Sequence, residues 1–275
     1  MSEAPALLPT ALHGLALAAA IAGATWLASL WRRDASLIDR CWSLMIALPG
    51  LLYLWLANAE RGATSARAAW AVGLALLWGL RLCIYVTRRN WGHGEDRRYR
   101  EIRARNQPNF EFKSLYLVFA LQAVLAWIVG APLLVAVLGD RPMGWLDGAG
   151  VLLTAFGIAF EAVADAQMAH FKSGPTQEAR VMDRGLWRYS RHPNYFGECC
   201  IWWGLWLLAL GAAGPAGAWS VVSPLLMTWL LLRVSGVRLL EKDIADRRPA
   251  YRDYVARTNA FVPGPPRRGE AGAGH

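Results

Sequence analysis

Charged residues are scarce in this chain of 275 residues, making up only 18% of it, and cysteine occurs four times. So few cysteines exclude a small scaffold held by disulfides. The chain is 55% hydrophobic and contains fifteen tryptophans, more apolar surface than a water-soluble core can bury. This composition also excludes a largely disordered chain. The class that remains is an all-α polytopic membrane protein.

Seven apolar segments are each close to the ~20 residues that a membrane-spanning helix needs. They cover residues 6–31, 41–58, 68–87, 115–138, 145–169, 195–214 and 217–240. The glycines and proline of residues 211–217 predict a tight hairpin between the last two segments. We expect one seven-helix domain over residues 1–263 and a disordered tail over residues 264–275, which is rich in Gly and Ala.

The positive charges follow the predicted spans. Of the 29 Lys and Arg residues, 25 fall in alternate connections that would lie on one side of the membrane, against 3 on the other. By the positive-inside rule, the N-terminus is outside and the C-terminus is in the cytosol. The first segment lacks a preceding positive charge and is too long for a signal peptide, so we expect it to be a span. In a bacterium, the protein would lie in the cytoplasmic membrane.

Ionisable side chains inside the predicted spans gather toward the cytosolic ends, and the outer half has essentially none. They are Asp39, Arg81, Tyr85, Glu161, Asp165, Glu198, Arg233 and Arg238. One interpretation is that these side chains lie at helix ends and extend to the membrane–water interface. The side chains of Asp and Glu are short, so this interpretation suits them less well. The other is a polar cavity that opens to the cytosol, because charges within a bilayer need partners or water. Such a lining suits an anionic nucleotide cofactor.

Two segments near the C-terminus contain most of the candidate cofactor-binding residues. The loop before the sixth segment offers cations for phosphate contacts, namely Lys172, Arg180, Arg184, Arg188 and Arg191. After it, Pro193 places Asn194 at a helix start, where free N–H groups favour anions. Farther on, the residues of 241–263 predict an amphipathic helix, with Ile244, Tyr251, Tyr254 and Val255 on one face. It would lie on the membrane surface, cover the cofactor pocket, or both.

The motifs "GLWRYSRHPNYFGE" and "EKDIADRRPAYRDYVARTNAFVP" resemble the C-terminal signature of the membrane steroid 5α-reductase superfamily, especially its bacterial branch. The earlier segments "SLIDRCWSL" and "LLWGLRLCIYVTRRNWGHGEDRRYREIR" fit the same branch, so the resemblance covers about residues 36–263. It implies seven helices and NADPH held in a cytosolic-side cavity. The implied activity is reduction of the C=C bond of a Δ4-3-ketosteroid or related enone, a lipophilic substrate that enters from the bilayer.

Carried over by motif, the resemblance assigns the cofactor cavity to Asp165, Lys172, Arg180, Tyr189, Asn194, Glu198 and Trp202. Arg233 and Arg238 are candidates for additional phosphate contacts. Lys172 stands where relatives often have Arg, which keeps the charge and loses the bidentate fork.

This chain departs more from the family pattern at the expected catalytic residues. The second segment lacks the glutamate that helps animal relatives hold the substrate carbonyl, and Trp78 or Tyr85 occupies the region of their catalytic tyrosine. We predict Tyr85 as hydrogen-bond donor to the enone oxygen, with Arg81 on the same helix face. Asp39 would orient the donor or replace it. The alternative for Arg81 and Asp39 is an interhelical ion pair that only fixes packing.

Other functions fit less well. Integral membrane methyltransferases that use S-adenosylmethionine share an "RHPxYxG" loop, but Asn194, Glu198 and the basic loop favour a phosphorylated dinucleotide. A transporter would show repeats or helices broken at the midplane. His170 and His192 lack metal-ligand spacing, so no metal is expected. Nucleic-acid binding is not expected either, because the positive charge follows membrane topology. Membrane lipids are the other expected partners.

Overall fold

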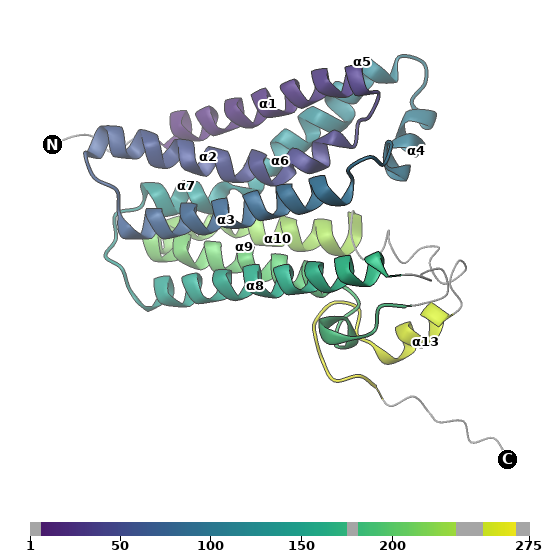
Figure 1. Ribbon diagram of the computed structural model, residues 1–275. Coiled ribbons are helices and arrows are strands. Elements are labelled where there is room, and N and C mark those ends of the chain that lie inside the picture. The colour runs from purple at the N-terminus through teal and green to yellow at the C-terminus, as the bar shows by residue number, and fades with distance from the viewer. Residues whose placement is uncertain (1–6, 175–180, 235–249, 268–275) are drawn as a thin grey trace. The chain divides into compact units, whose positions relative to one another are not determined.

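The computed structural model describes residues 7–174, 181–234 and 250–267, and within these ranges the chain forms helices and no strand (Figure 1). The all-α prediction is therefore confirmed. The contacts divide the chain into unit 1, residues 1–151 with 205–223, and unit 2, residues 152–204 with 224–275. In chain order the elements are α1 (Leu7–Arg32), α2 (Leu37–Arg61), α3 (Ala66–Arg89), α4 (Arg97–Arg105), α5 (Phe110–Ser114), η1 (Leu115–Ala120), α6 (Leu121–Val129), α7 (Ala131–Leu138), α8 (Trp145–Ser173), η2 (Gly185–Arg188), α9 (Pro193–Ala213), η3 (Gly214–Val221), α10 (Val222–Trp229), η4 (Leu230–Val234) and α13 (Ala250–Arg257).

In the described residues, six helical stretches are long and apolar enough to cross a membrane, as expected of a multi-pass membrane protein. They are Leu7–Arg32, Leu37–Arg61, Ala66–Arg89, Phe110–Leu138, Trp145–Ser173 and Pro193–Val234. The first five match the first five predicted segments to within a few residues at each end. The second, predicted to be short, is 25 residues long because it extends into polar residues at both ends.

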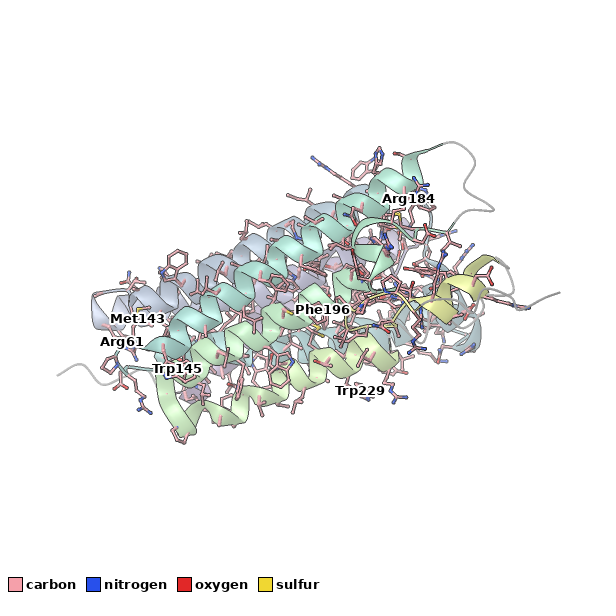
Figure 2. All side chains as sticks on the ribbon, turned by 90° about the horizontal axis from the view of Figure 1, so that it is seen from below. Arg61, Met143, Trp145, Arg184, Phe196 and Trp229 are labelled. Atoms are coloured by element: carbon pink, nitrogen blue, oxygen red, sulfur yellow. The ribbon has the colours of Figure 1, made fainter. Side chains whose placement is uncertain are left out.

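The sixth stretch, Pro193–Val234, covers both of the last two predicted segments. Gly214 begins η3 with φ +60°, a left-handed conformation that favours glycine. In unit 2 the thiol of Cys199 on α9 donates to the hydroxyl of Thr228 on α10 across 3.6 Å. Phe196 and Trp229 lie toward the same end of these two helices in Figure 2. The chain therefore folds back within this stretch, in the glycine-rich region where the hairpin was predicted.

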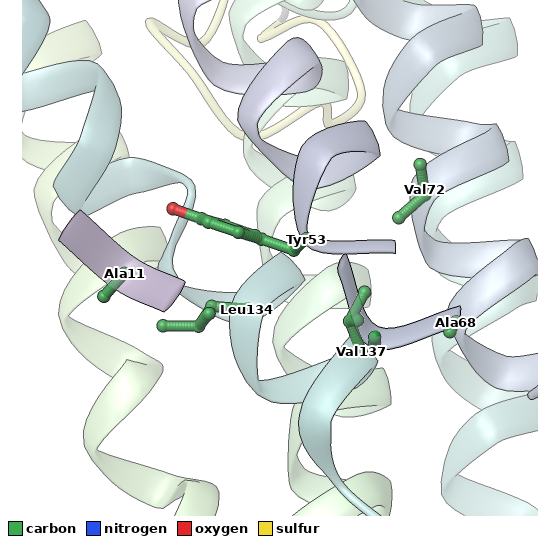
Figure 3. Packing of buried hydrophobic residues seen from close by; sticks show 7 residues of the cluster. Ala11, Tyr53, Ala68, Val72, Leu134 and Val137 are labelled. Atoms are coloured by element: carbon green, nitrogen blue, oxygen red, sulfur yellow. The ribbon is translucent and has the colours of Figure 1, made fainter. Parts of the chain in front are cut away.

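In unit 1, α2 packs against both α1 and α3 (Figure 1). One buried cluster joins these helices to α7, and Figure 3 shows its members, Ala11, Tyr53, Ala57, Ala68, Val72, Leu134 and Val137. Gly14 on α1 accommodates the ring of Tyr53, because a Cβ at that glycine would collide with the phenol. Small residues let the helices approach closely, as is usual in membrane bundles.

The connection between α3 and α5 contains a helix that the sequence did not predict. This helix, α4, begins after Asp96, whose Oδ1 accepts a hydrogen bond of 2.9 Å from the backbone N–H of Arg98. Such capping satisfies one of the free N–H groups at a helix start. Tyr99 is the buried residue of α4, and it ties the helix to the neighbouring elements of unit 1.

A buried ion pair links the beginnings of α3 and α8 in unit 1. The guanidinium Nε of Arg67 lies 2.5 Å from Oδ1 of Asp147, and both side chains are almost fully buried. The second bond of the fork, from Nη2 of Arg67 to Oδ2 of Asp147, is 3.0 Å long. The expectation that one half of the bundle lacks buried ionisable side chains is therefore wrong at this pair. This pairing could not be predicted, because Arg67 and Asp147 are 80 residues apart in the sequence.

Candidate functional site

In unit 2, α8 and α9 cross with their backbones in contact. A Cβ at Gly157 would lie 2.6 Å from the carbonyl oxygen of Gly197, and a Cβ at Gly197 would lie 2.8 Å from that of Gly157. Only glycine fits both positions without moving the helices apart. The crossing therefore fixes the spacing between the polar side chains that follow on each helix.

Those polar side chains are buried next to the crossing. Glu161 and Asp165 follow Gly157 at four-residue intervals on α8, and their exposed fractions are only 2% and 3%. On α9, Glu198 directly follows Gly197 and is 7% exposed. Acidic side chains are seldom buried so fully unless they have partners or a function.

Asn194 joins the two helices. Its side-chain Nδ2 donates a hydrogen bond of 3.3 Å to Oδ1 of Asp165. Its own Oδ1 is buried and accepts no hydrogen bond within the described part of the chain. Two residues predicted for the cofactor cavity, 29 positions apart, thus meet in unit 2 and leave a buried acceptor for a further donor.

The remaining predicted cofactor residues differ in exposure. Trp202 lies one turn beyond Glu198 on α9 and is fully buried. Lys172, at the last turn of α8, and Arg233 in η4 are exposed. Tyr189 is 44% exposed, and its carbonyl accepts a hydrogen bond from the N–H of Gly264. The predicted residues Arg180 and Arg238 lie outside the described residues.

Arg191 holds the C-terminal segment to the loop between α8 and α9. Nη1 of its buried side chain donates to the carbonyl oxygens of Thr258 at 2.5 Å and Val255 at 3.3 Å. The hydroxyl of Ser190 donates to the carbonyl of Phe261 across 2.7 Å. This guanidinium therefore attaches the C-terminal segment to the loop, a structural role that the sequence did not predict. The sequence could not reveal this, because the acceptors are backbone carbonyls more than 60 residues away.

α13 lies within the predicted amphipathic helix and packs on the same loop. The hydroxyl of buried Tyr254 donates to the carbonyl of Trp187 at 2.5 Å, and the indole N–H of Trp187 donates to the carbonyl of Ala164 at 3.0 Å. Tyr251 is buried too, as predicted, whereas Val255 is 37% exposed and lies outside the buried face. Ile244 lies outside the described residues.

The beginning of the predicted tail follows a defined path. The N–H of Gly264 bonds to the carbonyl of Tyr189, and that of Arg267 bonds to the carbonyl of Arg257 across 2.8 Å. Residues 264–267 are thus attached to unit 2, although the sequence predicted disorder from residue 264. The rest of the predicted tail, 268–275, lies outside the described residues.

In unit 1, Asp39 lies at the start of α2 and is bound by two side chains of α4. Nη2 of Arg98 lies 2.8 Å from Oδ2 of Asp39, and the hydroxyl of Tyr99 donates to Oδ1 across 2.6 Å. The amide of Gln122 on α6 in turn donates to the Tyr99 oxygen at 3.0 Å. The ion pair of Asp39 is thus with Arg98, not the Arg81 pair that the sequence left open. This network was missed because Arg98 and Tyr99 lie on a short helix that the sequence did not predict.

The electrostatics of this network keep its proton donors protonated. Burial, followed by the negative charge of Asp39 and the hydrogen bond to it, raises the pKa of Tyr99 well above its usual 10.0. Although burial disfavours its charge, the carboxylates of Asp39 and Asp96 raise the pKa of Arg98. Tyr99 therefore remains a neutral hydrogen-bond donor.

The other two predicted catalytic residues lie on α3. Arg81 and Tyr85 are four residues apart, so they occupy one face of the helix, and both are half-buried. The guanidinium carbon of Arg89 lies 5.8 Å from the centre of the Tyr85 ring. α3 thus holds the predicted donor beside a positive charge in unit 1. Among the described residues, no cluster of three or more His, Cys, Asp or Glu side chains could hold a metal ion.

Comparisons with known proteins found a curated relative and a matching family model. An uncharacterized protein of Schizosaccharomyces pombe is 25% identical over 279 aligned positions, which cover 91% of this chain and 78% of the relative. No solved structure matches the chain. The model of the family described as "Protein of unknown function (DUF1295)" matches residues 25–258, most of the chain. The chain therefore belongs to the DUF1295 family.

Proposed function

We propose that the protein is a membrane-embedded NADPH-dependent oxidoreductase that reduces the C=C bond of an enone. The proposed substrate is a Δ4-3-ketosteroid, and the product is its 5α-reduced form. The resemblance of the C-terminal motifs to the steroid 5α-reductase superfamily supports the reaction class. The observation that carries the proposal is the hydrogen bond between Asn194 and Asp165, two motif residues from separate helices.

The buried groups of unit 2 fit a nucleotide cofactor. The side-chain oxygen of Asn194 is buried and accepts no hydrogen bond from the described residues. An amide or hydroxyl group of a bound ligand could donate the missing hydrogen bond. Asp165 and Glu198 would accept hydrogen bonds from ribose or carboxamide groups, while Lys172 and Arg233 would bind phosphates. Arg180, Tyr189, Trp202 and Arg238 complete the proposed set. NADPH would supply the hydride.

We also propose seven spans, with the N-terminus outside and the C-terminus in the cytosol. The fold-back within Pro193–Val234 supports counting this stretch as two crossings. The distribution of Lys and Arg then supports the orientation. The cofactor residues at the cytosolic ends of the helices would face the compartment that contains NADPH.

The chain's own residues would polarise the substrate. In our proposal, the Tyr85 hydroxyl donates a hydrogen bond to the enone oxygen, and Arg81 on the same face favours the negative charge that develops there. Asp39 would orient the groups around the carbonyl through its bonds to Tyr99 and Arg98. Hydride addition at C5 and protonation at C4 would complete the reduction.

Cofactor-dependent stability tests the proposal directly. The thermal midpoint of the purified protein in detergent would be measured with NADPH, NADH or S-adenosylmethionine. We expect NADPH to raise it most, because the basic residues favour the additional phosphate. A rise with S-adenosylmethionine and none with NADPH would contradict the reductase and support a methyltransferase.

A further inference from the structure

A groove lies in unit 1, apart from the residues assigned to the proposed reductase site. It encloses about 350 Å³ between the connection that leads into α8 and the fold-back after α9. Arg141, Trp145, Leu146, Asp147, Leu210 and Pro215 are among its lining residues. Figure 2 labels Trp145 at this end of the molecule, close to Met143 and Arg61. Its volume falls within the range of small-molecule sites.

The carboxylate that lines this groove is already neutralised. Asp147 accepts both bonds of the Arg67 guanidinium, at 2.5 and 3.0 Å, and another of 2.7 Å from the N–H of Gly144. Arg67 also donates to the carbonyls of Arg141 and Pro142 at 2.8 and 3.0 Å. Asp147 therefore fixes the groove wall and offers little to a cationic ligand.

Arg141 supplies an uncompensated positive charge. Its guanidinium lies directly over Gly214, where a Cβ would collide with Nη1. Within the described part of the chain, this guanidinium forms no ion pair with a carboxylate. Its backbone N–H is anchored to the carbonyl of Ala212 across 3.2 Å. The groove thus holds one fixed cation with its donors available to an anion.

Apolar side chains supply much of the remaining groove lining. Leu146, Leu210 and Pro215 line it, and Trp145 stands at its edge with 80% of its surface exposed. Tryptophan collects at the level of lipid headgroups, where its ring contacts both apolar and polar groups. A ligand for this groove would therefore combine an anionic head with an apolar body.

We propose that this groove binds an anionic glycerophospholipid, with the phosphate on Arg141 and the start of an acyl chain along Leu146 and Leu210. An arginine guanidinium binds phosphate oxygens through charge-assisted, often bidentate, hydrogen bonds. The pairing of Asp147 with Arg67 disfavours zwitterionic lipids, because their ammonium group finds no available carboxylate on the groove wall that we describe. The site does not depend on the proposed reductase activity.

Lipid binding to the delipidated full-length protein tests this site. Native mass spectrometry would measure the affinity for phosphatidylglycerol and phosphatidylcholine, and thermal unfolding would be followed with each lipid and with inorganic phosphate. We expect phosphatidylglycerol to bind and stabilise the protein more than phosphatidylcholine does. Inorganic phosphate alone should have little effect, because it lacks the apolar body.

Two variants test separately whether lipid binding depends on the charge of the groove and on its shape. Arg141→Gln should weaken phosphatidylglycerol binding about tenfold, because a charge-assisted contact to phosphate is lost. Leu210→Trp keeps the charge and fills the groove, so it should also weaken binding, and it provides the test if Arg141→Gln fails to fold. Arg61→Gln is the matched control, since it removes one positive charge at the same end from a side chain that bonds the carbonyls of Val137 and Leu138.

Three results would overturn the proposal. One is equal affinity for phosphatidylglycerol and phosphatidylcholine. Another is wild-type phosphatidylglycerol affinity in a folded Arg141→Gln or Leu210→Trp protein. The third is equal stabilisation by inorganic phosphate, which would make this a site for a free anion.

Discussion

The side-chain amide of Asn194 on α9 donates a hydrogen bond of 3.3 Å to Oδ1 of Asp165 on α8. This bond sets the orientation of the Asn194 amide, so that its oxygen is the atom left without a donor in the described residues. A residue held in this way is a better test of the proposed cofactor site than an exposed cation, because its replacement by an apolar residue leaves the net charge of the protein unchanged.

Asn194→Leu should abolish stabilisation by NADPH and lower the rate of enone reduction at least about tenfold, since a buried acceptor and the partner of Asp165 are both lost. Thermal unfolding with and without NADPH, together with turnover of progesterone, would measure this. Asn58→Leu, at an exposed position on α2, is the matched control and should behave as the wild type. Normal NADPH stabilisation in folded Asn194→Leu would remove this residue from the site.

Isotope labelling tests the reaction course. Deuterium from labelled NADPH should appear at C5 of a Δ4-3-ketosteroid, and deuterium from heavy water at C4. The mass spectrum and NMR of the product would locate both labels. Cofactor deuterium at C3, in an alcohol, would indicate carbonyl reduction and contradict the mechanism.

Tyr99→Phe should lower the free energy of unfolding by about 1–3 kcal/mol, because the hydrogen bond to Asp39 is lost from a buried position. Denaturant titration in detergent would measure this. Tyr116→Phe, at a position 60% exposed, is the matched control and should have little effect.

The pH dependence of stability gives a second test at Tyr99. The pKa of Tyr99 in the folded protein lies well above the 10.0 usual for tyrosine, so the unfolded chain loses this proton first as the pH rises. The contribution of Tyr99 to the free energy of unfolding is therefore complete below pH 10.0 and decreases as the pH rises above that value. Tyr99→Phe should lack this component. Identical profiles of wild type and variant above pH 10.0 would contradict the assignment.

Arg67→Met should destabilise the protein by about 3–5 kcal/mol, because it leaves Asp147 charged and buried without its partner. The double variant with Asp147→Leu should recover much of this loss, since no unpaired charge remains. Arg97→Met provides the comparison at an exposed ion pair, where removal of one of the two arginine partners of Glu101 should cost less than about 1 kcal/mol. Equal losses in both single variants would show that burial does not determine the effect.

The spans were predictable because apolar runs of sufficient length have few other structures available to them, and the fold-back was predictable from the glycines before Gly217. α4 was not, because a nine-residue helix with one buried side chain, Tyr99, presents no apolar stripe to recognise. The partners of Asp39 were missed with it. The meeting of Asp165 and Asn194 was anticipated only through the motif resemblance, since composition and periodicity do not identify partners 29 residues apart.

The side-chain bonds from Arg191 and Ser190 to the C-terminal segment all end on main-chain carbonyl oxygens, those of Val255, Thr258 and Phe261. A carbonyl oxygen is supplied by every amino acid, so these three bonds depend on the course of the main chain, whereas the bond from the Tyr254 hydroxyl depends on a side chain of the segment. Substitutions at these three positions therefore keep the three acceptors, and replacement of Phe261 would remove only the contact of its ring with Phe196, whose centres are 5.9 Å apart. A one-residue deletion between them would misalign the remaining acceptors and detach the segment.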